Sequence, residues 1–154
     1  MSEEEILKKI KEKFGDYVLE ASIPRPRRVV VLVPPEKYKE VAKFVAKDLG
    51  LEFLGCITGA DKEDYMEIVA HIGYSICVLV KTRVPRDRPE VDSLVDVLPA
   101  AAFYEREAYD LLGIVFKGNP GIGKRFILPE DWPEGVYPLR KDYKPEHPKP
   151  LRET

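Results

Sequence analysis

Residues 65–84 of the chain read YMEIVAHIGYSICVLVKTRV, two runs of mostly apolar and β-branched side chains with Gly-Tyr-Ser between them. Such runs are typical of buried β-strands, and a short glycine-containing connection between two of them favours a hairpin. We therefore predict strands around Tyr65–Ile72 and Ile76–Val84. Outward from this hairpin, Val29–Val33 and Leu51–Thr58 predict further strands, so a β-sheet is expected to organise the core.

Helix signals alternate with these strands. Ser2 and Glu5 have the spacing of a capping box, and apolar residues at helical spacing follow them. Residues 34–50 begin with two prolines and end in glycine, the order in which a helix begins and stops. A third helix is predicted from about Val91, interrupted or kinked at Pro99.

The chain changes character near residue 118. Residues 1–117 predict an α/β domain of the two-layer α+β type, a mixed sheet with helices packed on it. Residues 118–154 are rich in proline and glycine and predict an extended docking tail without regular elements. Trp132, Tyr137 and Tyr143 lie in this tail, so its aromatic side chains pack either on the chain's own domain or on another protein.

Length and composition exclude several classes of protein. The 154 residues allow one ordinary domain, and 25 Lys+Arg against 27 Asp+Glu give no bulk field that would attract nucleic acid. Charged residues make up 34%, with few Cys and Met, a composition that suits a heat-adapted protein.

Membrane insertion and secretion are not expected. Uncharged runs such as Ala70–Val80 are too short for a membrane-spanning helix of about 20 residues, and the acidic start MSEEE does not resemble a signal peptide. A soluble, cytoplasmic protein is predicted.

Residues 118–124, GNPGIGK, have the spacing of a phosphate-binding loop up to the lysine. Arg125 stands where such a loop needs a Ser or Thr hydroxyl for Mg²⁺, and Pro120 removes an amide donor. Pro129 and Pro133 interrupt the helix that should follow. A small nucleotide-binding protein therefore stays a minor alternative to a simple Gly/Pro turn.

Residues 103–113, FYEREAYDLLG, predict a helix with an apolar and a charged face. Arg106 and Asp110 lie four apart on the charged face, with Phe103 beside them, which indicates either a solvated face or a contact surface. Metal binding by Glu107 and Asp110 is a third option. The residues expected to face the core are Tyr104, Ala108, Leu111 and Leu112.

Catalytic patterns are missing from the sequence. The only two histidines, His71 and His147, form no Ser-His-Asp or Cys-His arrangement and give a metal site little support. Cys56 and Cys77 lie in apolar runs and are expected to be small core residues, too few for a four-thiolate iron–sulfur site. The residues indicate a binding module without a cofactor of its own.

A family resemblance rests on short segments in a fixed order. These segments are Arg83-Val84-Pro85, Asp96, Pro99-Ala100-Ala101, Tyr104–Glu107, Asp110–Ile114, Phe116–Pro120 and Pro138–Tyr143. Together they resemble the thirty-kilodalton subunit of respiratory complex I and its homologue in membrane-bound, energy-converting nickel–iron hydrogenases.

The resemblance implies a scaffold role on the cytoplasmic side of the cell membrane, in a peripheral subunit that carries no redox centre. The implied partners are the [NiFe]-hydrogenase-like large subunit and the Fe–S subunits, with the membrane arm contacted indirectly. Fe–S clusters and a NiFe or quinone site are then expected in those partners. The interface residues implied are Phe103, Glu105, Arg106, Glu107, Asp110, Arg125, Trp132, Arg140, Asp142 and Tyr143.

Departures from the family pattern indicate which members of the family the chain resembles most. Asn119 replaces a histidine, Phe103 replaces a tryptophan, and residues 128–132 resemble hydrogenase-type and archaeal members. We expect a ferredoxin-oxidising membrane-bound hydrogenase or a sulfur-reducing relative. The alternative is a subunit of an NADH- or F420-type quinone oxidoreductase.

Overall fold

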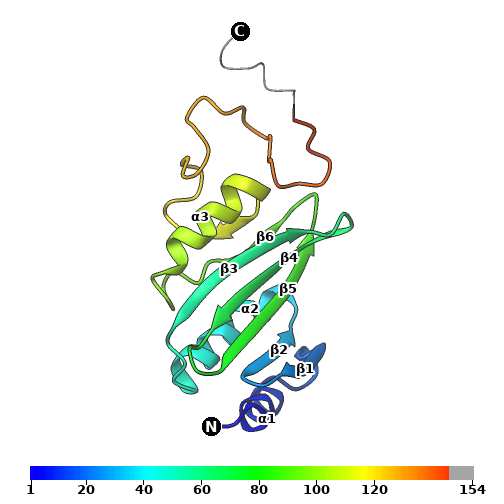
Figure 1. Cartoon of the computed structure of the whole chain (residues 1–154), viewed down its shortest axis with the longest axis vertical. Coiled ribbons are helices and arrows are strands. Elements are labelled where there is room, and N and C mark those ends of the chain that lie inside the picture. The colour runs from blue at the N-terminus through cyan, green and yellow to red at the C-terminus, as the bar shows by residue number, and fades with distance from the viewer. Residues whose placement is uncertain (146–154) are drawn as a thin grey trace.

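A five-stranded mixed sheet in the order β1-β2-β5-β4-β3 organises the fold (Figure 1). The structure, a computed structural model, describes residues 1–145. The strands are β1 (Glu20–Arg25), β2 (Arg28–Leu32), β3 (Leu54–Asp61), β4 (Tyr65–Ile72) and β5 (Cys77–Pro85). β2 pairs with β5 in parallel, and the other neighbours are antiparallel. The predicted fold class is confirmed.

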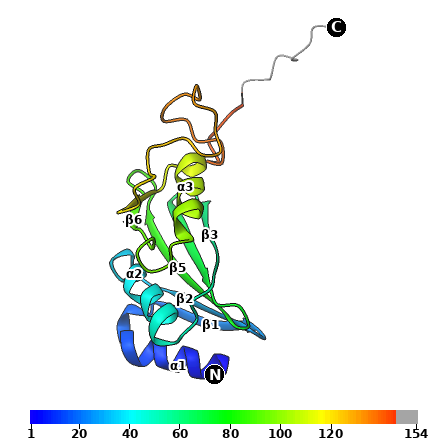
Figure 2. The ribbon, with the colours of Figure 1, turned by 90° about the vertical axis from the view of Figure 1, so that its left-hand side faces the viewer.

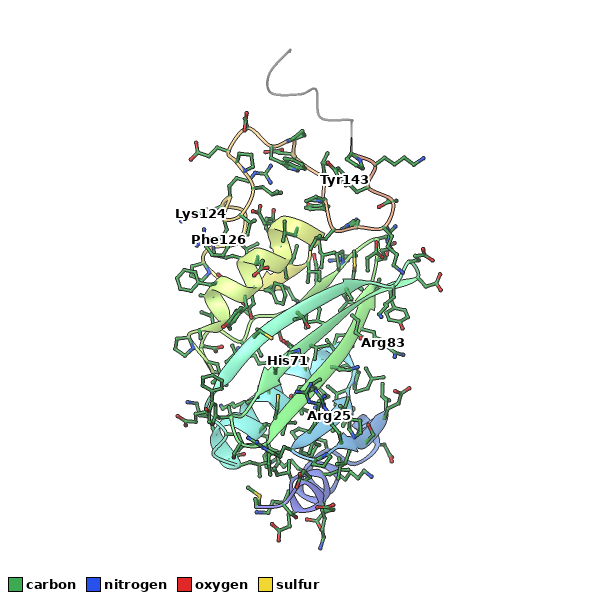
Figure 3. The ribbon with its side chains drawn as sticks, in the orientation of Figure 1. Arg25, His71, Arg83, Lys124, Phe126 and Tyr143 are labelled. Atoms are coloured by element: carbon green, nitrogen blue, oxygen red, sulfur yellow. The ribbon has the colours of Figure 1, made fainter. Side chains whose placement is uncertain are left out.

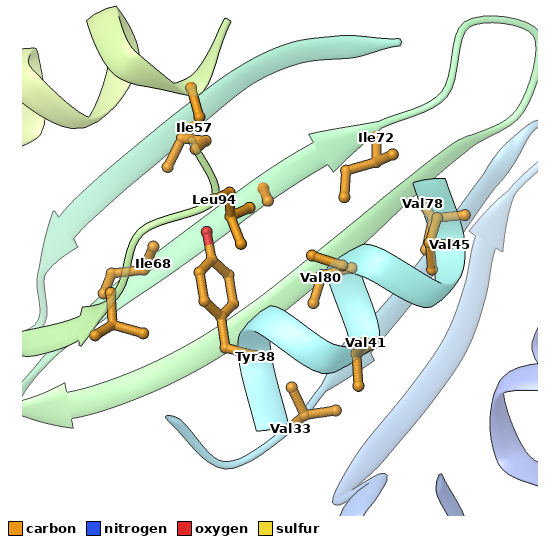
Figure 4. Close-up of a cluster of buried hydrophobic side chains, with 14 of the residues drawn as sticks. Val33, Tyr38, Val41, Val45, Ile57, Ile68, Ile72, Val78, Val80 and Leu94 are labelled. Carbon is orange, nitrogen blue, oxygen red and sulfur yellow. The ribbon is translucent and has the colours of Figure 1, made fainter. Parts of the chain in front are cut away.

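The β4–β5 hairpin forms where the sequence predicts it, with Ile72 opposite Val78 across the turn. Alternation along β4 places Met66, Ile68, Ala70 and Ile72 on the buried face, all fully inaccessible. The ring of Tyr38 packs among such side chains from several strands (Figure 4). One face of the sheet therefore carries the hydrophobic core.

The helices lie on that same face of the sheet (Figure 2). They are α1 (Glu3–Phe14), the 3₁₀ turn η1 (Gly15–Tyr17), α2 (Pro35–Lys43) with the π-helical turn η2 (Phe44–Asp48), and α3 (Ala101–Leu112). The predicted capping box is confirmed, because the Ser2 hydroxyl accepts from the Glu5 N–H at 3.2 Å and the Glu5 carboxylate accepts from the Ser2 N–H at 3.0 Å. None of the described helices is long and apolar enough to cross a membrane.

The prediction of a helix from Val91 is wrong. Glu90–Asp92 forms a short strand, β6, that pairs in parallel with β7 (Val115–Lys117). Turns follow, and α3 begins only at Ala101. Pro99 explains the delay, because proline lacks an N–H for a helix that is already running and disfavours helical geometry in the residue before it.

Residues 118–145 form no helix or strand and run over the end of α3 in turns (Figure 1). We call this segment the strap. Residues 146–154, which include His147 and the end of the predicted tail, lie outside the described part of the chain.

Candidate docking surface

Helix α3 ends at Gly113, whose backbone is left-handed with φ 77° and whose N–H donates to the Tyr109 carbonyl at 2.8 Å. Glycine adopts this conformation without strain. A Cβ atom here would approach the Tyr137 ring to 2.6 Å and the Arg140 guanidinium to 2.8 Å. The helix end is therefore shaped to let the strap pack closely against it.

Glu105 lies on the buried face of α3 and is 0% exposed. Its carboxylate accepts hydrogen bonds from the Ser93 hydroxyl at 2.6 Å, the Leu94 N–H at 2.7 Å and the Asn119 side-chain amide at 2.9 Å. Burial raises the pKa of Glu105, and these three donors oppose that rise. The carboxylate joins the loop before α3, the helix itself and the start of the strap.

Asp110 is also 0% exposed and holds the next part of the strap. Its Oδ2 accepts from the backbone N–H groups of Phe126, Ile127 and Leu128 at 3.2, 2.8 and 2.7 Å. The Arg125 guanidinium lies 3.5 Å from Oδ1. Burial alone would raise the pKa of Asp110, but the three N–H donors and Arg125 lower it below its usual value.

Two hydrogen bonds to backbone carbonyls of α3 fix the strap at Leu139 and Arg140. The Leu139 N–H donates to the Leu111 carbonyl at 3.0 Å, and Arg140 Nε donates to the Leu112 carbonyl at 2.8 Å. The last carbonyls of a helix have no intrahelical partner, so the strap satisfies two of them. The Arg140 guanidinium also lies 4.6 Å from the centre of the Tyr137 ring.

A bidentate ion pair fixes the far end of the strap. Asp61, at the end of β3, receives Arg86 Nε and Nη2 on its two oxygens, both at 2.9 Å, and the Lys141 N–H at 2.9 Å. Arg86 also donates to Asp142 at 3.0 Å. Hydrogen bonding from Arg86 lowers the pKa of Asp61 far below its usual value.

The predicted orientation of α3 is partly wrong. Ala108 and Leu112 face the core as expected, but Glu105 and Asp110 are buried within the chain and cannot present their side chains to a partner. The family resemblance implies both as interface residues, and periodicity places Asp110 on the charged face, but groups from the strap cover both carboxylates. Arg106 makes no ion pair with Asp110; it donates to the Arg125 carbonyl at 3.3 Å.

Apolar side chains stay exposed on this framework. Phe103 is 60% exposed, Phe126 39% and Ile127 54%, and the two rings lie 5.8 Å apart. The Arg106 guanidinium stacks 4.5 Å from the Phe126 ring. Phe103, Phe126 and Ile127 form an exposed apolar patch beside α3, with Arg106 stacked on one of its rings.

Farther along the strap, an open groove of about 630 Å³ is lined by Trp132, Tyr143, Arg140, Asp142 and neighbours. The Trp132 and Tyr143 rings are half-buried with centres 6.3 Å apart, and the Trp132 indole donates to the Val136 carbonyl at 2.8 Å. Figure 3 shows Phe126 alongside α3 and Tyr143 farther along the strap, beyond the end of the helix. We call the patch of Phe103, Phe126 and Ile127, together with this groove, the docking surface.

The predicted interface residues therefore separate into two groups. Glu105 and Asp110 position the strap from inside the chain, and Arg125 assists Asp110. The residues with exposed or half-buried side chains are Phe103, Arg106, Glu107, Trp132, Arg140, Asp142 and Tyr143.

Several residues that build this site gave no functional signal in the sequence. Asp61, Arg86 and Ser93 are separated from their partners by many positions in irregular chain, so no spacing pattern marks them. Asn119 stood out only as a departure from the family pattern, and it proves to bridge Glu105 and the Ala102 carbonyl.

The alternative sites do not assemble. Residues 118–124 form turns at the start of the strap, and no helix follows Lys124 within the described chain. Within residues 1–145, no three His, Cys, Asp or Glu side chains gather in a way that could hold a metal ion. Glu107 is exposed, while the Asp110 carboxylate already receives three backbone donors.

The defining geometry of this site is a helix end that the chain's own strap covers, edged with exposed aromatic side chains. Residues 31–149 match the family model described as the respiratory-chain NADH dehydrogenase 30 Kd subunit, and the chain belongs to this family. The predicted family is confirmed.

Similar proteins come from several kinds of complex. The chain is 38% identical over 143 residues to a subunit of the F420H2 dehydrogenase of Methanosarcina mazei, covering 90% of this chain and 89% of that one. It is 31% identical to the beta subunit of the membrane-bound hydrogenase of Pyrococcus furiosus, covering 92% and 86%. A chain of the archaeal membrane-bound sulfane sulfur reductase superposes with a TM-score of 0.79 at 34% identity, covering 92% and 85%.

Proposed function

We propose that this chain is a non-catalytic scaffold subunit in the peripheral arm of a membrane-bound, ion-pumping oxidoreductase related to complex I. It lies on the cytoplasmic side of the membrane and docks on the [NiFe]-hydrogenase-like large subunit. The Fe–S clusters and the NiFe or quinone site belong to the partner subunits. The supporting observation is the docking surface: apolar side chains left exposed on a framework that polar contacts hold in place.

Polar contacts hold this region of the chain in place without burying its exposed apolar side chains. The strap is anchored by hydrogen bonds and ion pairs at Glu105, Asp110 and Asp61, while Phe103 and Ile127 remain more than half exposed. Burying such side chains against a partner is favourable by about 25 cal/mol per Å² of apolar surface. Because the framework is already ordered, little of that gain is spent on ordering the strap.

Within this class, we propose a ferredoxin-oxidising hydrogenase or a sulfur-reducing relative. Support comes from the hydrogenase and sulfane sulfur reductase relatives, each covering most of the chain. The alternative is an F420H2- or NADH-type quinone oxidoreductase, which the 38% identity to the F420H2 dehydrogenase relative favours. Electron-transfer assays on the purified complex distinguish these, with reduced ferredoxin, F420H2 or NADH as donor and protons, sulfane sulfur or a quinone as acceptor.

Co-purification tests the scaffold role. The chain is tagged in its native host, and the large subunit that accompanies it from solubilised membranes is quantified by mass spectrometry. Replacing Phe103 and Ile127 together with Asp is expected to lower the recovered large subunit by about tenfold or more. Leu19→Asp is the matched control, because Leu19 is equally exposed at 59% but lies between α1 and β1. Full recovery with the double variant would contradict the proposal.

A further inference from the structure

The two edges of the sheet differ in how they are protected. β1 carries Glu20, Pro24 and Arg25, the kind of residues that keep an edge strand from pairing with other chains. β3, at the other edge, has neither a charged residue nor a proline between Leu54 and Ala60. A bulge near Gly55 is its only irregularity. An unguarded edge of this kind is a template for another strand.

The free edge of β3 opens onto an apolar groove of about 250 Å³ between β3 and α3. Four consecutive residues of β3, 56–59, line one side, and Tyr104 and Leu111 of α3 line the other, with Leu139 of the strap at 58% exposure. Among residues 1–145, the backbone of 55–60 makes no hydrogen bond outside its pairing with β4. Backbone donors and acceptors therefore face an apolar channel.

One charged side chain lines this groove, the carboxylate of Glu107. Burial is the main cause that raises the pKa of the Cys56 thiol on β3, and the negative charge of Glu107 is the second. The carboxylate therefore lies close to the strand. Within the described part of the chain, no Lys or Arg side chain lines the groove. A segment that fills it with a cation opposite Glu107 would match both its shape and its charge.

We propose that an extended, apolar segment of a neighbouring subunit, carrying one Lys or Arg, adds as a further strand along the free edge of β3. Its backbone pairs with β3, alternate side chains enter the groove beside Tyr104 and Leu111, and its cation meets Glu107. The inference rests on the proposed function, because the segment comes from a subunit of the same assembly. It adds a second contact, separate from the docking surface.

Hydrogen exchange followed by mass spectrometry tests this proposal on the intact chain, alone and in the purified complex. Strand addition is expected to slow exchange of the outward amides of β3 by about tenfold or more in the complex. Glu107→Lys is expected to remove most of that added protection while the amides of residues 126–128 stay protected. Glu12→Lys, the same charge change on exposed α1, is the control, and Leu111→Asp is a second groove variant, compared after its folding is checked by thermal unfolding.

The outcomes separate the two proposals. Equal exchange of β3 in the free chain and the complex, with a complex that still assembles, overturns strand addition and leaves the scaffold role intact. Protection of β3 that appears in the isolated chain and grows with its concentration assigns the edge to a second copy and also overturns it. A chain that never co-purifies with other subunits refutes the scaffold role itself.

Discussion

Replacing Asp110 with Asn tests whether one carboxylate holds the first half of the strap. Asn keeps the shape and one acceptor oxygen but removes the charge. Hydrogen bonds to a charged group contribute about 1.5–3 kcal/mol each and neutral ones about 0.5–1.5 kcal/mol, so three bonds weaken by about 3 kcal/mol together. Because Phe126 and Ile127 are partly exposed, water can hydrogen-bond to some of the released amides and offset part of this loss. We expect about 2 kcal/mol of local destabilisation.

The measurement is amide exchange at residues 126–128 in the isolated chain. A loss of about 2 kcal/mol makes opening about thirtyfold more frequent, and exchange of these amides is expected to accelerate by the same factor. Asp131→Asn is the matched control, because Asp131 is an exposed strap carboxylate with no hydrogen bond to the described chain. Unchanged exchange at 126–128 in the Asp110 variant would refute the anchoring role of this carboxylate.

The same anchor predicts a pH dependence. The folded-state pKa of Asp110 is lowered from a usual value of about 3.9, so its stabilisation is complete above that value and is lost as the pH falls toward the folded pKa. Amides 126–128 of the unaltered chain should therefore lose protection on acidification below about pH 4. In the Asn variant this acid-induced loss at 126–128 should be largely absent.

Three further predictions concern single residues. Gly113→Ala should destabilise the strap by about 1–3 kcal/mol in urea unfolding, because the new methyl group meets Tyr137 and the left-handed backbone disfavours alanine; unaltered stability would contradict the packing at this helix end. Glu105→Ala should cost about 3–5 kcal/mol, since its three donors are left in a buried site, and a loss under about 1 kcal/mol in the same assay would argue against the network. Burial, and then the charges of Arg28 and Lys81, lower the pKa of His71, so its NMR titration should have a midpoint below about pH 6.5. Because the folded chain then binds this proton less readily than the unfolded chain, the fold should lose stability as the pH falls. A midpoint above that value would mean that protonation of His71 stabilises the fold instead.

Local signals in the sequence predicted most of the framework. The capping box at Ser2 and the β4–β5 hairpin depend on residues within a few positions of one another. The sequence did not predict β6, because its partner strand, β7, begins more than twenty residues later in the chain. A strand of three residues carries too little pattern to compete with the helical spacing beyond it.

The sequence predicted the strap as a segment, but it did not predict the contacts that hold the strap in place. Helical periodicity placed Asp110 on the charged face opposite the core, because the periodicity describes only the helix and not the chain that covers it. The groups that bury Asp110 are backbone amides 126–128, and those that satisfy Glu105 come from residues 93, 94 and 119. Irregular chain has no period, so only the folded structure reveals which face it covers.

Polar anchoring explains how a proline-rich strap can present an apolar surface. Many of its backbone groups cannot pair in a sheet or helix, and buried amides without partners are costly. The carboxylates of Asp110 and Asp61 accept hydrogen bonds from backbone N–H groups of the strap. The last carbonyls of α3 accept two hydrogen bonds from strap donors. These polar contacts hold the strap together with the packing of Tyr137 on the helix end and of Ile122 on the core. Phe103, Phe126 and Ile127 are consequently free to be buried against another subunit, at an angle set by a carboxylate network and not by the partner.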